Sequence, residues 1–326
     1  MKKAAVFVAL LLCLGMLAGC QKTPEVKRSM ADADKVILLG YAQLGSESGW
    51  REGNTRSIYD AAQAHGIKLR FENAEQKQSK QIDAIRSFIA YRVDVIAFSP
   101  IVADGWDVVL SEAKAAGIPV LLVDRGIETA DESLYDCFIG SDFVEEGRAA
   151  ARFLKRRTAQ YEQVRIVEIT GTEESTPMKD RYQGFREELG DEPKYQIIDS
   201  VSGDFLRSRG KECMKQLLAA HEDIDVLYSH NDSMTLGAVE AIEAAGLVPG
   251  KDIVIITVDG EQQAIDLLKQ GKINCVVECT PMLGETVMQL TERLVAGETI
   301  DRVVYSNERI FSEYDDDLES LAPRGY

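Results

Sequence analysis

The chain has 326 residues, of which 45% are hydrophobic, enough for real hydrophobic cores. At roughly 100–200 residues per domain, this length predicts two domains. The formal net charge of −17 at pH 7 argues against nucleic acid as a partner, because such binding depends on cationic contacts to phosphate.

The first twenty residues have the pattern of an export signal. Met1–Lys3 is a short basic head, residues 4–18 are an apolar run, and the run ends in Leu17–Cys20. A basic head, an apolar stretch and small residues before a cleavage site are typical of a secretory signal. The apolar stretch is shorter than the roughly 20 residues of a membrane span, and no second long apolar segment follows.

The end of this segment resembles the lipobox of bacterial lipoproteins, in which the cysteine carries the lipid. We therefore expect residues 1–20 to be a lipoprotein signal peptide, with Cys20 as the lipidation site. An ordinary secretion signal that happens to end in cysteine is the alternative. Residues 21–34 are polar and aperiodic, which predicts a tether between the lipid and the fold.

Four further cysteines lie in the body of the chain: Cys137, Cys213, Cys275 and Cys279. In an exported protein they allow up to two disulfides, with three possible pairings, or they are scattered buried thiols. Cys275 and Cys279 lie on one predicted strand, about 13 Å apart, so they cannot pair with each other.

Strands and helices alternate from residue 36 onward. Apolar runs rich in Val and Ile predict strands, and apolar residues at helical spacing predict helices between them. The strands expected in the first half are 36–41, 67–71, 93–99, 118–124 and 134–141, with helices at 49–65, 79–91 and up to 117. Such runs suit parallel strands buried on both faces, so the alternation predicts right-handed crossovers and a doubly wound sheet.

The second half repeats this pattern. Its expected strands are 164–170, 195–200, 225–229 and 253–258, with helices ending near 190, 221 and 246. An aspartate stands at the carboxyl end of a strand in each half, Asp124 in the first and Asp259 in the second. Ligands of open α/β sheets bind outside the carboxyl ends of the strands. Two such sheets that face each other predict one ligand cleft between two lobes.

Polar and aromatic side chains gather at these predicted strand ends. Carboxylates, amides and guanidinium groups can hydrogen-bond adjacent hydroxyls, and aromatic faces can stack on the C–H face of a sugar ring. The candidate ligand-binding residues are Glu47, Trp50, Arg51, Asp124, Arg125, Arg181, Phe205, Asn231, Asp259 and Glu278. Such a set suits a neutral polyol. Other roles remain open: Trp50 as a core residue, and Asp124 or Asn231 as helix caps.

Several of these segments together resemble the periplasmic sugar-binding proteins of ribose-type ABC importers, and most closely the galactofuranose-binding proteins. The resemblance covers nearly everything from residue 36 to residue 326. The segments that carry it are Gly45–Arg51, Gln76–Gln78, Arg86–Phe88, Asp124–Arg125, Ser202–Phe205, Arg207–Ser208, Gly210–Glu212, His230–Asp232 and Glu278.

The resemblance implies an α/β fold of two doubly wound parallel-sheet lobes joined by a three-stranded hinge, the type I periplasmic binding protein. The crossovers are expected near Ser141–Asp142, Glu278–Thr280 and Val303–Tyr305. Lobe one is then 35–141 plus 280–303, and lobe two is 142–279 plus 304–326.

The resemblance also implies a role for each candidate residue. In the first lobe Asp124 and Arg125 clamp sugar hydroxyls, while Trp50 covers a ring face with Arg51 beside it. The hydrogen-bonding positions of the second lobe are Arg181, Asn231 and Asp259, its stacking aromatic is Phe205, and Glu278 stands where ribose binders carry an amide.

The expected function is that of a monomeric solute-binding lipoprotein in the cell envelope. It would take a monosaccharide, galactofuranose-like or another pentose or hexose, to the transmembrane subunits of an ABC permease. It would meet the membrane only through its lipid and would need no cofactor or metal. A sugar sensor that feeds a chemoreceptor or a sensor kinase is the alternative.

Two other classes of protein fit the sequence less well. A sugar-responsive repressor would carry a basic helix-turn-helix where this chain has its signal. A hydrolase could use Asp124 and Asp259 as paired carboxylates, but the chain lacks a Gly-x-Ser-x-Gly elbow, a phosphate loop and a His-Glu-x-x-His motif. We therefore expect no enzymatic activity.

Overall fold

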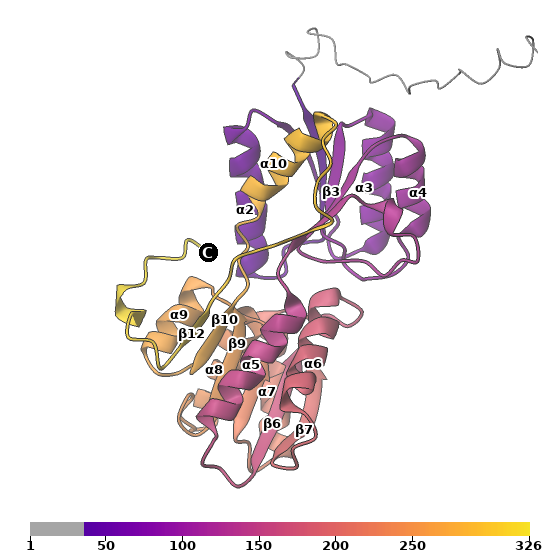
Figure 1. The fold of residues 1–326 in the computed structure, drawn as a ribbon. Coiled ribbons are helices and arrows are strands. Elements are labelled where there is room, and N and C mark those ends of the chain that lie inside the picture. The colour runs from indigo at the N-terminus through magenta and orange to yellow at the C-terminus, as the bar shows by residue number, and fades with distance from the viewer. Residues whose placement is uncertain (1–35) are drawn as a thin grey trace, which may run out of the picture. The chain divides into compact units, whose positions relative to one another are not determined.

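A computed structural model describes residues 36–326 of the chain. The predicted signal peptide, Cys20 and the tether over 21–34 lie outside the described residues. Two six-stranded sheets, each with helices against it, make up the fold (Figure 1). Among the described helices, none combines the length and the apolar character that a membrane crossing requires.

The first sheet has the strand order β2-β1-β3-β4-β5-β11, and all its pairs are parallel. Its strands are β1 (Leu38–Gln43), β2 (Lys68–Asn73), β3 (Val95–Phe98), β4 (Val120–Val123), β5 (Cys137–Gly140) and β11 (Val303–Tyr305). Its helices are α2 (Gly49–Ala64), α3 (Gln78–Tyr91), α4 (Asp107–Ala115) and α10 (Gly284–Val295), with a short 3₁₀ turn, η2, at Glu132–Leu134.

The second sheet has the equivalent order β7-β6-β8-β9-β10-β12, in which only β12 is antiparallel. Its strands are β6 (Val164–Thr170), β7 (Tyr195–Ser202), β8 (Val226–Ser229), β9 (Val254–Asp259), β10 (Cys275–Glu278) and β12 (Ile310–Ser312). Its helices are α5 (Phe143–Arg157), α6 (Thr176–Leu189), α7 (Arg207–Ala220), α8 (Asp232–Ala244) and α9 (Gln262–Lys269), and a 3₁₀ turn, η3, follows at Leu318–Ser320.

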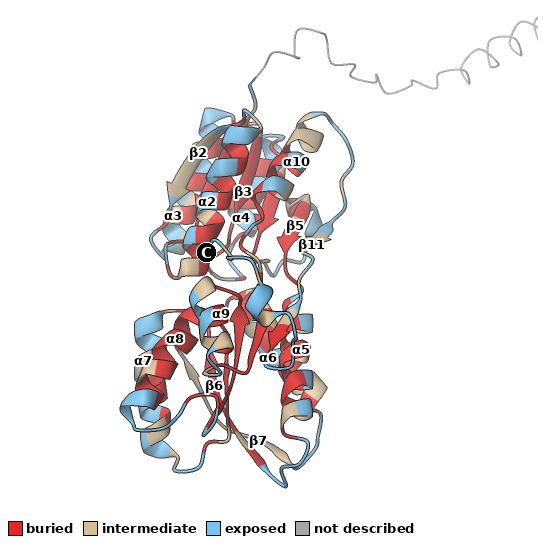
Figure 2. Cartoon of the chain, turned by 90° about the vertical axis from the view of Figure 1, so that its left-hand side faces the viewer, coloured by how far each residue is buried: buried red, intermediate tan, exposed pale blue. Residues whose placement is uncertain are grey.

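Helices cover both faces of each sheet, so each sheet has two hydrophobic cores. In the first sheet, Ile58 of α2 packs in one core with Val287 of α10, and Phe88 of α3 lies in the other. In the second sheet, Phe153 of α5 and Leu217 of α7 belong to opposite cores. The strands are accordingly buried and the outer helix faces exposed (Figure 2). This is the predicted pair of doubly wound sheets, with buried parallel strands.

Three crossovers connect the two sheets. The chain passes from β5 to α5, from β10 to α10, and from β11 to β12. The third differs from the prediction, because Val304 and Tyr305 pair with Ile139 and Gly140 of the first sheet. The third crossover therefore begins after Tyr305, whereas the prediction placed it near Val303–Tyr305. A three-residue edge strand leaves little periodicity from which to assign it to a sheet. Apart from this shift, the lobe boundaries stay a prediction.

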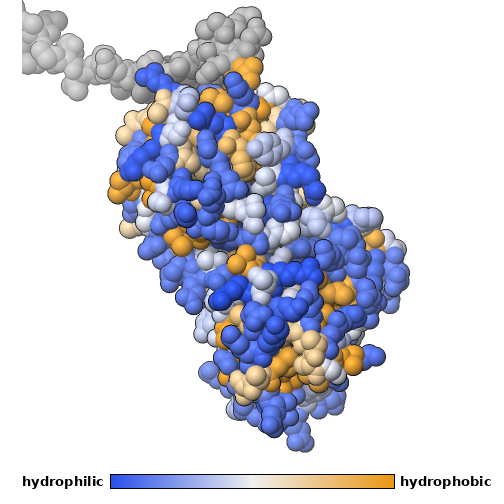
Figure 3. Space-filling view, turned by 180° about the vertical axis from the view of Figure 1, so that it is seen from behind, coloured by the Kyte–Doolittle hydropathy of each residue, from blue (hydrophilic) through white to orange (hydrophobic). Residues whose placement is uncertain are grey.

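The four cysteines of the described part are all buried free thiols. Of the two alternatives that the sequence left open, disulfides or scattered buried thiols, the structure shows buried thiols at Cys137, Cys213, Cys275 and Cys279. The surface seen in Figure 3 is mostly hydrophilic, with scattered hydrophobic side chains, as is normal for a folded protein in water.

Candidate functional site

Helix α2 presents two candidate residues at the end of β1. Ser48 is its N-cap, and the Ser48 hydroxyl accepts a hydrogen bond from the backbone N–H of Arg51. This cap fixes the first helical turn. Trp50 and Arg51 therefore lie at the carboxyl edge of the first sheet, both buried.

Three candidate residues have a left-handed backbone, which non-glycine residues seldom adopt. Their φ angles are 67° at Asp124, 130° at Asp259 and 61° at Phe205. Asp124 and Asp259 follow or end strands of the two different sheets, so the repeat seen in the sequence extends to backbone conformation. Unusual φ values cluster at functional sites, where the surrounding structure holds them.

Nine of the ten candidate residues line one pocket. The pocket residues from the first lobe are Glu47, Ser48, Trp50, Arg51, Asp124 and Arg125. Those from the second half of the chain are Pro177, Arg181, Phe205, Asn231, Asp259 and Cys279. The structure thus brings together the carboxyl ends of the strands of both sheets, where doubly wound proteins bind ligands.

Buried ion pairs order the first-lobe side of the pocket. Arg125 Nη2 donates to Glu47 Oε1 at 2.7 Å, and Arg51 Nη2 donates to Asp124 Oδ2. Gln76 Nε2 donates to the second oxygen of Glu47 at 3.1 Å. Burial opposes ionisation of Arg51, but Asp124 and Glu47 outweigh it and raise the pKa of its guanidinium. Buried pairs of this kind hold their charged side chains in fixed positions, because breaking one from a single side leaves an uncompensated charge.

Arg181 and Asn231 order the second-lobe side. Arg181 donates from Nε to Glu146 Oε2 at 2.7 Å and from Nη1 to the His230 carbonyl at 2.6 Å. Asn231 is the N-cap of α8 and accepts from the Met234 N–H at 2.9 Å. Asn231 therefore has both of the roles considered from the sequence, because it caps the helix and also lines the pocket.

Two aromatic rings complete the walls. The guanidinium of Arg51 lies 4.6 Å from the Trp50 ring centroid, and that of Arg125 lies 5.2 Å from the Phe205 centroid. The Trp50 indole also donates to the Cys279 carbonyl at 2.6 Å, and the ring packs in a core of the second lobe. Trp50 is thus a packing residue and a pocket residue together.

Several polar atoms of the pocket have no protein partner. Arg51 Nε and Nη1, Arg125 Nε and Asp259 Oδ2 are buried and make no hydrogen bond to any described residue. A buried polar atom without a partner is costly, and these atoms offer both donors and an acceptor. The charged lining side chains comprise three carboxylates and three guanidiniums. This mixture of donors and acceptors, with neither kind of charged group in excess by number, favours a neutral ligand rich in hydroxyl groups.

Glu278 does not line this pocket. Its carboxylate contacts Arg324 and accepts from the Arg309 N–H at 3.0 Å, beside a different surface pocket. Successive side chains of a strand point to opposite faces, so the next residue, Cys279, lines the pocket in its place. The sequence placed Glu278 at the correct strand end but on the wrong side.

The sequence reasoning missed three pocket residues and one supporting glycine. Ser48, Pro177 and Cys279 line the pocket. At Gly171 a Cβ would lie 1.9 Å from Cζ of Phe205, so only glycine leaves room for that ring. Ser48 and Pro177 could have been found from their places at the starts of helices, whereas no local signal marks Gly171.

The carboxyls of the second lobe should make stability depend on pH. Burial and the neighbouring Asp232 raise the pKa of Asp259 well above its usual range, and burial and Glu261 raise the pKa of Asp232 to about 8. In the unfolded chain both titrate near 3.9, so between about pH 4 and pH 8 the folded state binds more protons. The free energy of unfolding, measured by urea unfolding, should therefore fall as pH rises from about 4 to 8.

Asp259→Asn is the control for this pH dependence. Its amide cannot titrate, so the fall should be shallower than in the parent protein. A free energy of unfolding that rises over this range, or an unchanged slope in the variant, would contradict the assignment.

The family profile described as "Periplasmic binding protein domain" matches residues 40–299, most of the chain. The chain belongs to the periplasmic binding protein family. This is a family of binding proteins and not of enzymes, as the sequence predicted.

Close relatives of this periplasmic binding protein share most of its length. The galactofuranose-binding protein YtfQ of Escherichia coli K12 is 40% identical over 79% of this chain and 81% of its own. A crystal structure from Mycobacterium smegmatis in complex with β-D-fucofuranose has a TM-score of 0.85 and 46% identity, covering 87% of this chain and 93% of that one.

A third relative is the binding protein of the arabinose ABC transporter from Shewanella sp. ANA-3, bound to α- and β-L-arabinofuranose. It has a TM-score of 0.83 and 39% identity, and the match covers 87% of this chain and 94% of that one. The predicted resemblance and fold are thereby confirmed: this protein has the two-lobed fold of the type I periplasmic binding proteins.

Proposed function

We propose that this protein is the sugar-binding component of an ABC importer and that its ligand is a monosaccharide in the furanose ring form. The observation that carries the proposal is the interlobe pocket. Carboxylates and guanidiniums line it in equal number together with two aromatic rings, and its unpartnered donors and acceptor suit a neutral polyol. Furanose sugars are the ligands of two close relatives, and an ABC transporter is the context of one.

Both lobes supply groups to the pocket, so the sugar would favour the closed state over an open one. Direct hydrogen bonds between the two lobes add to the stability of the closed arrangement. Trp50 N–H donates to Glu261 at 3.1 Å, Ala103 N–H to the Glu174 carbonyl at 2.8 Å, and Gly126 N–H to Thr176. Closure would present one surface, shared by both lobes, to the permease.

A sugar screen tests the binding step. Galactose, arabinose, fucose, ribose and fructose would be compared by thermal shift, followed by methyl furanosides and methyl pyranosides whose ring form is locked. A ligand at a hundredfold excess over its Kd stabilises the folded protein by about 2.7 kcal/mol. We expect such a stabilisation with at least one free sugar, and with a furanoside in preference to its pyranoside.

Stabilisation by no sugar would overturn the proposal, and preference for the pyranoside would overturn the furanose assignment. With the ligand known, small-angle X-ray scattering tests closure, because the radius of gyration should fall at saturation. An unchanged radius would contradict a closing step.

Attachment to the membrane through a lipid on Cys20 is part of this proposal, although that residue lies outside the described part of the chain. Its support is the Leu17–Cys20 ending of the signal segment. Mass spectrometry of the mature N terminus tests it, and an unmodified cysteine would refute it.

A further inference from the structure

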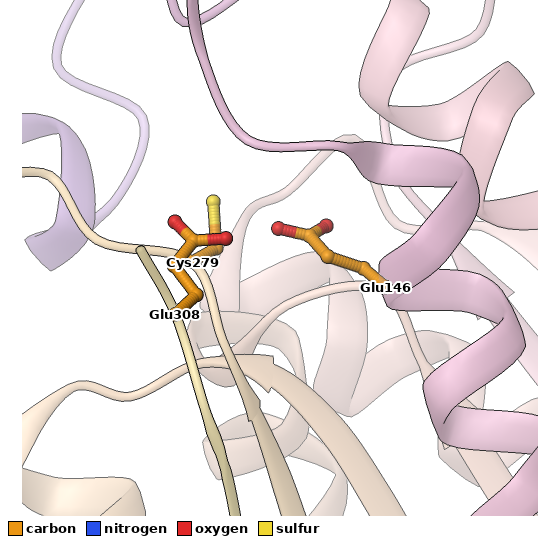
Figure 4. A group of neighbouring side chains, drawn as sticks. All are labelled: Glu146, Cys279 and Glu308. Carbon is orange, nitrogen blue, oxygen red and sulfur yellow. The ribbon is translucent and has the colours of Figure 1, made fainter. Parts of the chain in front are cut away.

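A second group of reactive side chains lies at the junction of the two lobes, outside the charged clamp of the pocket. Glu146, Cys279 and Glu308 point toward one another (Figure 4). One carboxylate oxygen from each glutamate and the Cys279 sulfur all lie within 4.8 Å of one another. Each residue comes from a different crossover region: the start of α5, the turn after β10, and the link between β11 and β12.

Only some of the carboxylate oxygens in this group have hydrogen-bond partners in the protein. Glu308 Oε1 accepts from the Ser141 hydroxyl at 2.6 Å and from the Thr280 N–H at 2.8 Å. Glu146 Oε2 accepts from Arg181, but Glu146 Oε1 has no partner among the described residues. The Glu146 side chain is 4% exposed, and its carboxylate faces Cys279 and Glu308. An unpartnered buried carboxylate oxygen is costly, and it belongs to a carboxylate that faces two other possible ligand groups (Figure 4).

The chemistry of the three groups selects a class of cation. A bound cation displaces the protons of its ligands, and the two carboxylates and the thiolate would then carry three negative charges. The neighbouring Arg181 balances one of them, so a divalent cation would make the group neutral. Calcium and magnesium take oxygen ligands alone, whereas zinc takes sulfur together with carboxylate oxygen. Zinc is tetrahedral, and the Ser141 hydroxyl, 3.3 Å from the Cys279 sulfur, or a water could supply the fourth position.

A route from solvent to the group exists. Glu146 and Glu308 also line a surface pocket in which Asp142, Glu145 and Glu278 outnumber the basic residues Arg152 and Arg309. Acidic side chains at such an entrance attract cations. The lining of this pocket does not include Asp124 or Arg125, so it is distinct from the first-lobe side of the sugar pocket.

We propose that Glu146, Cys279 and Glu308 form a binding site for Zn²⁺ or a similar thiophilic divalent cation at the hinge. The bound ion would tie together the three crossovers that join the lobes. The ion would lie next to the sugar pocket, because Cys279 lines that pocket and Glu146 binds the pocket residue Arg181. The proposal rests on these three residues and not on the identity of the sugar.

Cobalt is the probe for this site, because a thiolate bound to Co²⁺ gives a charge-transfer band in the near ultraviolet that oxygen ligands do not give. Metal-free protein titrated with Co²⁺, without sugar, should take up one equivalent with that band, and Zn²⁺ should abolish it. Cys279→Ser should lose the band. Cys213→Ser, which removes a buried thiol outside the group, should keep it.

Glu308→Gln gives a second measurement that does not touch the thiol. It should weaken Zn²⁺ binding, measured by calorimetry, by about tenfold or more. No charge-transfer band in the parent protein, or a band that persists in Cys279→Ser, would overturn the site. Unchanged Zn²⁺ affinity in Glu308→Gln would also overturn it, even if Cys279→Ser fails to fold. Since the readout is the metal, failure here leaves the sugar proposal standing.

Discussion

Asp124→Asn should raise the Kd for the sugar by about a hundredfold or more, a loss of about 2.7 kcal/mol. The carboxylate lines the pocket and holds Arg51, and hydrogen bonds to charged groups are worth about 1.5–3 kcal/mol each. Asparagine is the informative replacement, because φ is 67° here and asparagine tolerates a left-handed backbone. Isothermal titration calorimetry with the sugar found in the screen measures the change.

Asp204→Asn is the matched control. Asp204 also has a left-handed backbone, with φ of 54°, but its side chain is 45% exposed and pairs with Arg209 outside the pocket. Its sugar affinity should stay within about twofold of the parent protein. Asp124→Asn with parental affinity would refute the clamp role of Asp124.

Arg181→Met should lower the free energy of unfolding by about 3–5 kcal/mol even without sugar. The change leaves the buried Glu146 carboxylate without its cation and removes the donor to the His230 carbonyl. Breaking a buried pair from one side costs about that much, because it leaves an uncompensated charge. Urea unfolding of the ligand-free protein measures the loss, and sugar binding should be lost as well.

Two variants separate this effect from a general cost of removing an arginine. Arg148→Met breaks an ion pair to Glu187 in which both side chains are 41% exposed, and exposed pairs contribute about 0–1 kcal/mol. Adding Glu146→Gln to Arg181→Met should recover part of the lost stability, because the unpaired charge is gone. A loss within about 1 kcal/mol for Arg181→Met alone would show that Glu146 does not depend on it.

The repeated pattern of strands and helices was predictable because it is local. Apolar runs and helical spacing give the alternation, and the observed strand β6 has the predicted bounds of Val164–Thr170. The candidate residues at the strand ends were predictable for a related reason. Parallel strands direct their carboxyl ends to one edge, so a polar residue after a strand is placed there by topology alone.

The errors came from features with little local signal. Glu278 and Cys279 differ by one position at a strand end, and that single step decides which face a side chain takes. The three residues Val303–Tyr305 join the first sheet, although nothing in so short a segment names its partner strand. The need for glycine at position 171 depends on the Phe205 ring, which lies 34 positions further along the chain.

The amino-acid sequence alone predicted the two doubly wound units, the strand-end aspartates and the class of ligand. Periodicity and residue chemistry act over short stretches of chain, so they can be recognised without the tertiary structure. Only tertiary structure decided the partners. Arg51 pairs with Asp124 and Arg125 with Glu47, and Glu146 meets Cys279 and Glu308 at the crossovers. Those contacts join residues 73 to 162 positions apart, and at such separations packing and the directions of the strands determine which charges meet.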